Sequence, residues 1–314
     1  MSTSSGSESL LAPKNLAAFL TVSLIWGGTW LVIRDQISSV PPSWSITWRF
    51  VVAALGMFVL AKLRGEPFRL SRDGWKWAAA LGLFQFSLNF SFVYNAEGYI
   101  TSGLVAVMFA LLVVPNAILG KFVLGQPIRR EFVLGSTIAA FGVAMLFAQE
   151  YRASPATLAE VLTGAALTVG GILSASAANI VQAMEGAKKQ PLLTLLAWSM
   201  VVGVVLNSLF ALATEGAPQF DPRPSYGLGI LYLGLLGSVV TFPLYYGLVR
   251  KVGAGTAAYS SVIVPIVAMI LSTLFEGFVW GPLPAAGAAI TLIGMVVAMR
   301  GRAAPPPRRA TPEP

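Results

Sequence analysis

The sequence predicts an all-α integral membrane protein: ten transmembrane helices, arranged as two inverted five-helix repeats around a central cavity. Three observations predict this fold class. Of the 314 residues, 56% are hydrophobic and only 11% are charged, a balance that is unusual for a water-soluble domain. The apolar residues gather in runs of about 20, the length that crosses a bilayer. The second half of the chain also repeats the pattern of the first, which indicates an internal duplication.

The duplication is clearest around two prolines. When Pro265 is aligned with Pro115, the segment SVIVPIVAMILSTLFE lies against LLVVPNAILGKFVLGQ. After two residues of extra loop, GAAITLIG at 287–294 lies against GSTIAAFG at 135–142. Each half therefore contains a helix with a central proline, followed by a helix with spaced glycines. Because five spans per half is an odd number, the second copy must insert upside down relative to the first.

The elements are expected in the following order. Residues 1–14 are Ser-rich and predict a disordered N-terminal tail. Spans one to five fill a first repeat over 15–150, and spans six to ten fill a second over 151–300. A Pro-rich cytoplasmic tail follows over 301–314. The ten apolar runs cover about 15–33, 43–61, 74–95, 100–120, 131–148, 159–181, 191–213, 226–249, 256–276 and 283–300.

The basic residues predict the orientation. Most of the 21 Lys and Arg residues fall near the two ends of the chain or in the even-numbered loops. The positive-inside rule therefore puts both termini in the cytoplasm. Four arginines lie outside this pattern: Arg34, Arg49, Arg152 and Arg223.

The composition also limits the chemistry. The chain has no cysteine and no histidine, which excludes disulfides and removes the usual zinc ligand and the usual neutral-pH base. It has no GxSxG or HExxH motif and no paired intramembrane aspartates. We therefore expect that the chain is not an enzyme and that it binds neither a cofactor nor a metal ion. The net charge of +8 is interpreted as a topology signal rather than a nucleic-acid surface.

Several features together carry a family resemblance. They are Leu-Ile-Trp-Gly at 24–27, Arg49, the two proline-containing spans, Glu276 after span nine, and the paired glycine spans. The chain resembles the drug/metabolite transporter superfamily, in its ten-helix EamA branch, over about residues 15–300. It departs from the family pattern at Gly125-Gln126, where Gly-Glu is common. Within the branch it is most similar to the YddG-type amino-acid exporters.

The resemblance implies a multi-pass transporter of a bacterial inner membrane that exports amino acids and related metabolites. It also implies a cavity lined by spans 1, 3, 4, 6, 8 and 9, with spans 5 and 10 as packing supports. The expected partners are a small-molecule substrate and membrane lipids, without nucleic acid. A monomer is compatible with the sequence, which leaves the oligomeric state open.

Two amides and one tryptophan are the first candidate substrate-binding residues. Gln85 and Asn89 are four residues apart on span three and share a helix face. Amides are costly in hydrocarbon and face a cavity or another helix, so the pair either binds the substrate or clamps two helices together. Trp26 lies deep in span one and is expected to line the cavity, whereas Trp30 is expected to anchor the helix at the membrane interface.

Further candidates lie on spans four, six, eight and nine. Phe109 and Tyr259 occupy matching places in the two repeats, and with Tyr246 they offer ring faces that suit an amphipathic or aromatic solute. The alternative for tyrosines is interfacial anchoring. Ser174 and Asn179 lie toward the cytoplasmic half of span six, where polar residues are also tolerated without a ligand.

Pro115 and Pro265 are candidate hinges. Each lacks a backbone N–H and allows a kink in its helix, and a symmetric pair of kinks suits a moving gate. The alternative is a static bend, which is common in membrane helices.

The placement of charges predicts the energetics of transport. No Asp or Glu falls at the centre of a span, so we expect facilitated diffusion, with Glu97 as the candidate if transport is coupled to protons. Arg49 enters span two only partly and is expected to pair with Asp35 or to reach toward the surface. The absence of deeper cations argues against phosphate-bearing substrates.

Three functions compete at this stage. The first is amino-acid export by alternating access. The second is export of multiple drugs or cationic aromatic compounds, which aromatic rings could bind. The third, an intramembrane enzyme, is disfavoured by the missing catalytic motifs.

Overall fold

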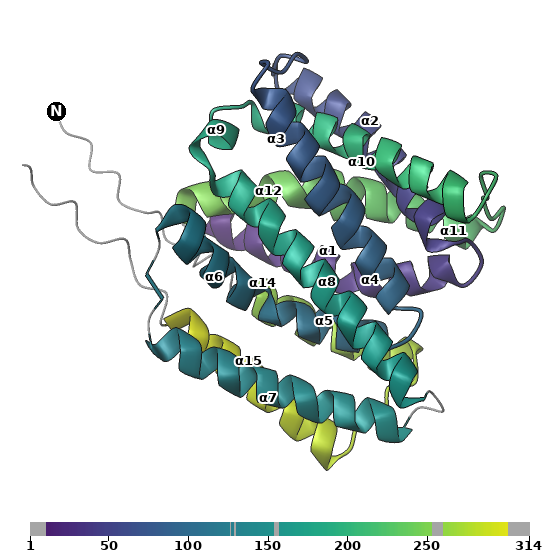
Figure 1. The fold of residues 1–314 in the computed structure, drawn as a ribbon, viewed down its shortest axis with the longest axis vertical. Helices are drawn as coiled ribbons and strands as arrows, with labels where there is room; N and C mark the ends of the chain where they lie inside the picture. The colour runs from purple at the N-terminus through teal and green to yellow at the C-terminus, as the bar shows by residue number, and fades with distance from the viewer. Residues whose placement is uncertain (1–10, 126, 129, 154–156, 253–259, 301–314) are drawn as a thin grey trace, which may run out of the picture.

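The structure is a computed structural model that describes residues 11–125, 127–128, 130–153, 157–252 and 260–300. All regular structure in these ranges is helical (Figure 1). The elements are α1 (Pro13–Ile37), α2 (Pro42–Leu63), α3 (Gly74–Leu81), η1 (Gly82–Asn89), α4 (Phe90–Ala96), α5 (Ser102–Phe109), η2 (Ala110–Leu112), α6 (Val113–Leu124), α7 (Arg130–Ala153), α8 (Leu158–Ala183), α9 (Glu185–Lys188), α10 (Leu192–Thr214), α11 (Pro224–Leu231), η3 (Tyr232–Val240), α12 (Thr241–Val252), α14 (Ser260–Phe275) and α15 (Pro282–Arg300).

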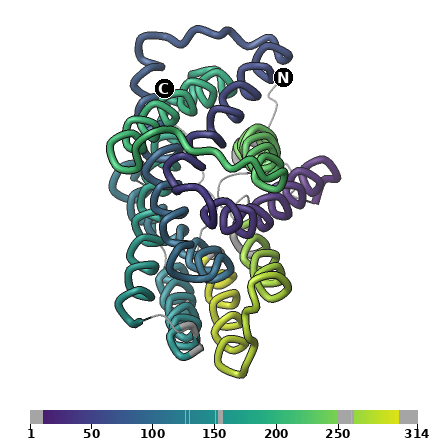
Figure 2. Tube along the Cα trace, turned by 90° about the vertical axis from the view of Figure 1, so that its right-hand side faces the viewer, coloured from purple at the N-terminus to yellow at the C-terminus, as the bar shows by residue number. Residues whose placement is uncertain are grey.

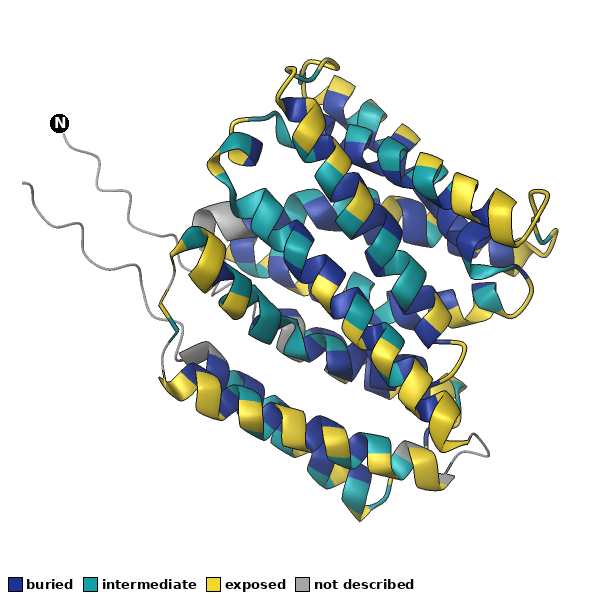
Figure 3. Ribbon diagram, viewed as in Figure 1, coloured by how far each residue is buried: buried dark blue, intermediate teal, exposed yellow. Residues whose placement is uncertain are grey.

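The helices have the length and the apolar outer surface of membrane-spanning helices. Seven helical segments of the described chain are long and apolar enough to cross a bilayer, and two shorter apolar helices, Ile263–Phe275 and Pro282–Ala298, accompany them. Large apolar side chains point outward: Leu55, Phe141 and Leu209 are 64%, 63% and 60% exposed, and exposed positions run along the outer faces of the helices (Figure 3). Such a surface would be unstable in water but suits hydrocarbon. The all-helical membrane character of the predicted fold is thus confirmed.

Helices α2 and α10 come from different halves of the sequence and pack antiparallel. Near the start of α2, Trp48 Nε1 donates to Gln219 O, beyond the end of α10, at 2.7 Å. Near the start of α10, Trp198 Nε1 donates to Phe68 O, beyond the end of α2, at 2.8 Å. The Glu66 carboxylate also accepts from the first backbone N–H groups of α10, where a negative charge is favourable. Each helix is therefore held at both ends by the other half of the chain.

Helices α7 and α15 form a second antiparallel pair, along one edge of the molecule (Figure 1; Figure 2). Their glycines bring the two backbones into contact. A Cβ atom at Gly135 would lie 2.1 Å from Ala298 N, and one at Gly294 would lie 2.3 Å from Ala139 N. Glycine alone allows this approach, as in other closely packed membrane helices. The two helices contact the rest of the bundle on one side only and leave the centre to the others.

Irregular helix turns occur where the chain approaches the centre. Both α3–α4 and α11–α12 are continuous helical segments interrupted by π-helical turns, η1 and η3, and such turns gather at functional sites. In the α5–α6 segment, the 3₁₀ turn η2 ends three residues before Pro115. Because a proline has no N–H and its ring crowds the preceding turn, the helix tightens there.

Candidate functional site

A cavity of about 180 Å³ lies at the centre of the bundle. Helices from both halves of the chain surround it: α1, α2, η1–α4 and α5–α6 from the first half, and α8, α12 and α14 from the second. Helices α7 and α15 contribute no lining residue among those described. The residues that line it are Trp26, Thr29, Trp30, Ile33, Arg49, Gln85, Asn89, Phe90, Val93, Ala106, Phe109, Ala110, Leu112, Val113, Asn116, Ala175, Asn179, Phe242, Tyr245, Tyr246, Ser260, Val264 and Pro265.

Aromatic rings form much of the wall. Trp26 packs against Tyr245 with ring centroids 5.1 Å apart, and its Nε1 donates to Gly237 O of η3 at 3.3 Å. Trp30 packs against Phe109 at 5.2 Å. Trp30 is 9% exposed, so the expectation that it anchors the helix at the interface was wrong. These contacts join α1 to both α12 and α5.

The amide pair of η1 faces the same cavity. Gln85 Nε2 donates to Asn89 Oδ1 at 3.4 Å, and Asn89 Nδ2 donates to Gly171 O of α8 at 2.9 Å. Asn89 therefore makes the interhelical contact that one hypothesis expected, and it also lines the cavity. Within the described part of the chain, Gln85 makes no hydrogen bond to another helix, so its amide is the freer of the two to contact a solute.

The other candidate residues differ in whether they line the cavity. Asn179 lines the cavity, and its Nδ2 donates to Asn116 Oδ1 of α6 at 3.4 Å. Tyr246 also lines it. Ser174 does not line the cavity; its hydroxyl donates to Gly170 O of its own helix at 2.9 Å. Tyr259 lies outside the described residues.

The two prolines differ in their surroundings. Pro265 lies inside α14 and lines the cavity. A Cβ atom at Gly27 of α1 would lie 3.3 Å from Val264 O, so α1 passes close to α14 directly before the proline. Pro115 lies in α6 and does not line the cavity. A conformational change at Pro265 would therefore act on the cavity directly.

Arg49 is placed differently from the sequence expectation. It is 2% exposed and lines the cavity. Its guanidinium donates to Tyr94 Oη and to Ser238 Oγ, each at 3.4 Å. The expectation that it pairs with Asp35 was wrong, because Asp35 lies 3.9 Å from Arg223 instead. The premise that no cation lies deep in the protein was therefore also wrong.

Two carboxylates lie near the turn that joins α4 to α5. Glu97 is fully buried in this turn, and neither carboxylate oxygen has a hydrogen-bond partner among the described residues. Burial raises the pKa of Glu97 well above its ordinary value, and Glu276 nearby raises it further against the opposing effect of Arg34 and Arg49. Glu276, directly after α14, accepts from Ser102 Oγ at 2.5 Å, which ties the end of α14 to the start of α5.

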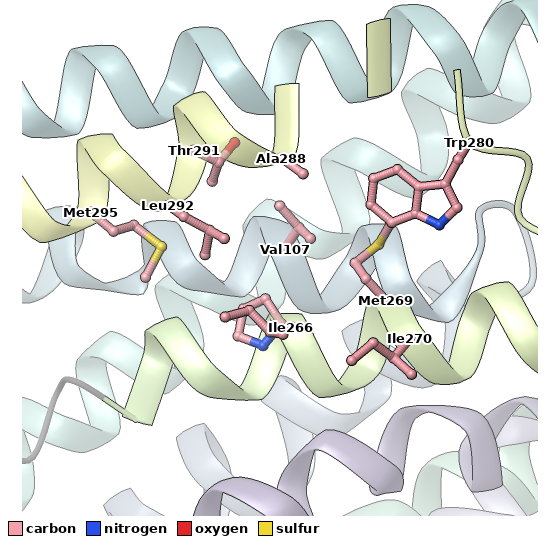
Figure 4. Close-up of a pocket in the computed structure, with 10 residues that line it drawn as sticks. Val107, Ile266, Met269, Ile270, Trp280, Ala288, Thr291, Leu292 and Met295 are labelled. Atoms are coloured by element: carbon pink, nitrogen blue, oxygen red, sulfur yellow. The ribbon is translucent and has the colours of Figure 1, made fainter. Parts of the chain in front are cut away.

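A second hollow, of about 250 Å³, lies between α5, α14 and α15 (Figure 4). Val107, Ile266, Leu292 and the methionines Met269 and Met295 dominate its lining (Figure 4). Its polar groups are already satisfied, since Thr291 Oγ1 donates to Gly287 O and Trp280 Nε1 donates to Thr273 Oγ1. The hollow therefore offers little to orient a polar solute, and the central cavity is the better candidate site.

Three of the wall residues that sequence reasoning missed are Arg49, Trp30 and Asn116. Arg49 and Trp30 are close to span ends, which favoured the interfacial interpretation. Asn116 directly follows Pro115, and an amide inside an apolar run beside a helix-breaking proline is the signal that could have identified it. Only the packing of the helices shows that all three meet in one place.

The apolar helices and the enclosed polar and aromatic cavity define a class, the polytopic membrane transporters, whose solute sites lie inside the bundle. Comparison with known sequences identifies the family within this class to which the chain belongs. The chain belongs to the EamA-like transporter family, whose sequence model matches residues 14–148 and again 162–300. The members of this family are transporters, which confirms that the chain is not an enzyme.

Three individual relatives share between 21% and 27% sequence identity with the chain. "Protein PagO" of Salmonella typhimurium is 25% identical over 267 residues, covering 83% of this chain and 84% of that protein. The "Uncharacterized inner membrane transporter YedA" of Escherichia coli is 27% identical, covering 83% and 82%. A Salmonella typhimurium protein named "Probable amino-acid metabolite efflux pump" is 21% identical, covering 90% and 93%. One crystal structure has a TM-score of 0.66 with 19% identity over 91% of this chain and 96% of that chain, and supports the fold alone.

Proposed function

We propose that the chain exports amino acids, neutral and aromatic ones included, and related small metabolites by alternating access. The central cavity carries the proposal. Its volume, about 180 Å³, exceeds the roughly 150 Å³ of a cavity that holds benzene. Its wall combines ring faces with amides, which suits a small solute that has both an apolar and a polar part. The relative named for amino-acid metabolite efflux agrees with this choice.

Alternating access requires two states, and we propose that an inverted repeat supplies them. The proposed repeats span 15–150 and 151–300, with ten transmembrane helices in all and terminal tails at 1–14 and 301–314. Three observations support the repeat. The pairs α2–α10 and α7–α15 are antiparallel, Trp48 and Trp198 make equivalent bonds at opposite ends, and both halves contain a π-helical segment. Two inverted halves can exchange conformations and so open the cavity to each side in turn.

We further propose a bacterial inner-membrane location with both termini in the cytoplasm. The positive-inside pattern supports the orientation, and the relative named as an inner membrane transporter supports the location. Within the cavity, the proposed substrate-binding residues are Trp26, Gln85, Asn89, Phe109, Asn179 and Tyr246. Tyr259 and Ser174 stay proposals from the sequence, and Pro115 and Pro265 are the proposed hinges.

Export of cationic aromatic compounds is the second candidate, and the aromatic wall favours it. The charge of the cavity opposes it. Among the described lining residues, Arg49 alone carries a charge, and that charge is positive. A cationic solute would enter without a compensating carboxylate, so amino acids are the better proposal.

The test is transport by the purified full chain in liposomes. Vesicles loaded with one unlabelled amino acid should transiently accumulate the same labelled amino acid above its outside concentration, whereas empty vesicles should only equilibrate with the outside. A panel of neutral, aromatic, acidic and basic amino acids is compared with cationic dyes. Movement of dyes alone would replace the amino-acid proposal with the second candidate.

A further inference from the structure

Arg49 is a buried cation without a nearby anion. Only 2% of its surface is exposed, and no carboxylate of the described residues lies within ion-pair distance of it. Removing such a charge from water is costly unless an opposite charge compensates. Among the described residues, a carboxylate that compensates the charge of Arg49 is therefore missing from its immediate surroundings.

The groups around Arg49 are neutral. Its guanidinium lies 4.3 Å from the centroid of the Phe90 ring, which orients the plane of the group. Its hydrogen bonds to Tyr94 and Ser238 are both long, at 3.4 Å, and charge-assisted bonds to an anion are much shorter. Its Nε has no hydrogen-bond partner among the described residues. The guanidinium is thus held in place but its donors are incompletely used.

Glu97 is the internal carboxylate to consider. Its charge interacts with that of Arg49, yet its oxygens bond to no described group and it does not line the cavity. Arg49 does line the cavity, next to the amide pair and the aromatic wall. A solute in the cavity can therefore reach Arg49 but not Glu97.

We propose that Arg49 binds the carboxylate of the transported solute. This rests on the proposed function and specifies the substrate class: a small molecule with a carboxylate and an apolar or aromatic part. A guanidinium fork matches a carboxylate through two parallel N–H donors, and the unpartnered Nε supplies one of them. The rings of Trp26, Phe109 and Tyr245 then face the apolar part.

The experiment compares acids with amides of the same shape. Two pairs serve as probes: L-phenylalanine with L-phenylalaninamide, and 3-phenylpropionate with 3-phenylpropanamide. Binding to the purified full chain is measured by calorimetry and by the fluorescence of the cavity tryptophans, for the wild type, Arg49→Gln and Arg49→Lys. Arg223→Gln is the matched control, because this arginine is exposed and pairs with Asp221 outside the cavity.

We expect the wild type and the control to prefer the acid in both pairs. Arg49→Gln should weaken acid binding about tenfold or more, the effect of losing a charged hydrogen bond, and leave the amides nearly unchanged. Arg49→Lys should keep part of the preference. If Arg49 only holds helices together, acid and amide will weaken equally and their ratio will stay constant, which overturns the proposal.

The two proposals fail in different ways. If amino acids are transported but the acid preference survives in Arg49→Gln, the anion site is wrong and the export function stands. If 3-phenylpropionate shows the Arg49-dependent preference but no amino acid is transported, the anion site stands and the substrate must be another carboxylate. A wild type without acid preference in either pair overturns the anion site.

Discussion

Gln85 and Asn89 illustrate how two similar amides in one helix acquire different roles. Asn89 donates to the backbone of α8, so part of its hydrogen bonding stabilises the bundle. Gln85 bonds only to Asn89 among the contacts described and leaves its side chain toward the cavity. The helix spacing alone placed both residues on one face, and the neighbouring helix determined which of them is used for packing.

This difference predicts the outcome of two substitutions. Gln85→Ala should reduce transport at normal membrane abundance, because it removes a cavity amide without breaking a bond to another helix. Asn89→Ala should reduce both transport and thermal stability, by about 1 kcal/mol for the lost interhelical bond. Transport assays and melting in detergent measure the two effects. Asn95→Ala changes an exposed amide and is the control; unimpaired transport by Gln85→Ala would remove Gln85 from the site.

Glu97 predicts a pH dependence of stability. Because burial raises its pKa in the folded protein above the ordinary 4.5, the folded state binds a proton more tightly than the unfolded state. Stability is therefore highest when this group is protonated and decreases as pH rises from about 4.5 through the raised pKa. Glu97→Gln should make the melting temperature less dependent on pH. Glu131→Gln, at an exposed carboxyl of α7, should follow the wild type, and an unchanged slope in Glu97→Gln would contradict the burial effect.

At the scale of elements, the irregular turns concentrate around the cavity while regular helices pack at the edge. The π turns of η1 and η3 and the proline of α14 lie beside lining residues. The pair α7–α15 contains no such interruption and is joined by backbone contacts at its glycines. This arrangement favours movement near the cavity and rigidity at the edge.

The proline of α14 gives the first prediction at this scale. Pro265→Ala restores a backbone donor and should straighten the helix, so the exchange between states should slow. Turnover should fall while the binding constant stays close to that of the wild type. Pro282→Ala, at the exposed start of α15, is the matched control. Wild-type turnover in Pro265→Ala would reduce Pro265 to a static bend.

The glycine contacts of α7 and α15 give the second prediction at the scale of elements. Gly294→Val places side-chain atoms where the Ala139 backbone lies, so the helices must separate. Overpacking of this kind costs about 1–3 kcal/mol or more, which a lower melting temperature in detergent will report. Gly227→Ala adds a methyl group in open space and should melt near the wild type. Equal melting of both variants would contradict the packing of this pair.

At the scale of the whole molecule, the cavity belongs to both halves of the chain. Its lining contains no carboxylate among the described residues, and Glu97 lies outside it. A proton-coupled transporter needs a titrating group that responds to the solute. The arrangement therefore favours transport down the gradient of the solute itself.

Transport should then persist when a protonophore collapses the proton gradient across liposomes that contain the full chain. Glu97→Gln should show the same persistence, because it removes the remaining candidate for coupling. Loss of wild-type transport on collapse, together with uncoupled transport by Glu97→Gln, would assign coupling to Glu97 and contradict the expectation.

Much of the candidate site could be predicted from local pattern. Trp26, Gln85, Asn89, Phe109, Asn179 and Tyr246 were selected as polar or aromatic residues inside apolar runs, and all of them line one cavity. The predictions for Arg49 and Trp30 are wrong, because the distance of a residue from the end of its span does not determine how deeply its side chain is buried. Depth along one helix does not tell which neighbours surround a side chain.

The sequence by itself determined that the chain is helical, lies in a membrane and belongs to its transporter family. The helical fold and the membrane location follow from composition and run length, because hydrocarbon forces each backbone donor and acceptor to pair within its own helix. The family follows from the resemblance that the duplicated proline and glycine spans carry. The tertiary structure alone decided that Arg49 is buried against Phe90 beside the cavity and that Asp35 pairs elsewhere. Such partnerships depend on the rotation and crossing of helices far apart in the chain, which the spacing of residues within one helix does not specify.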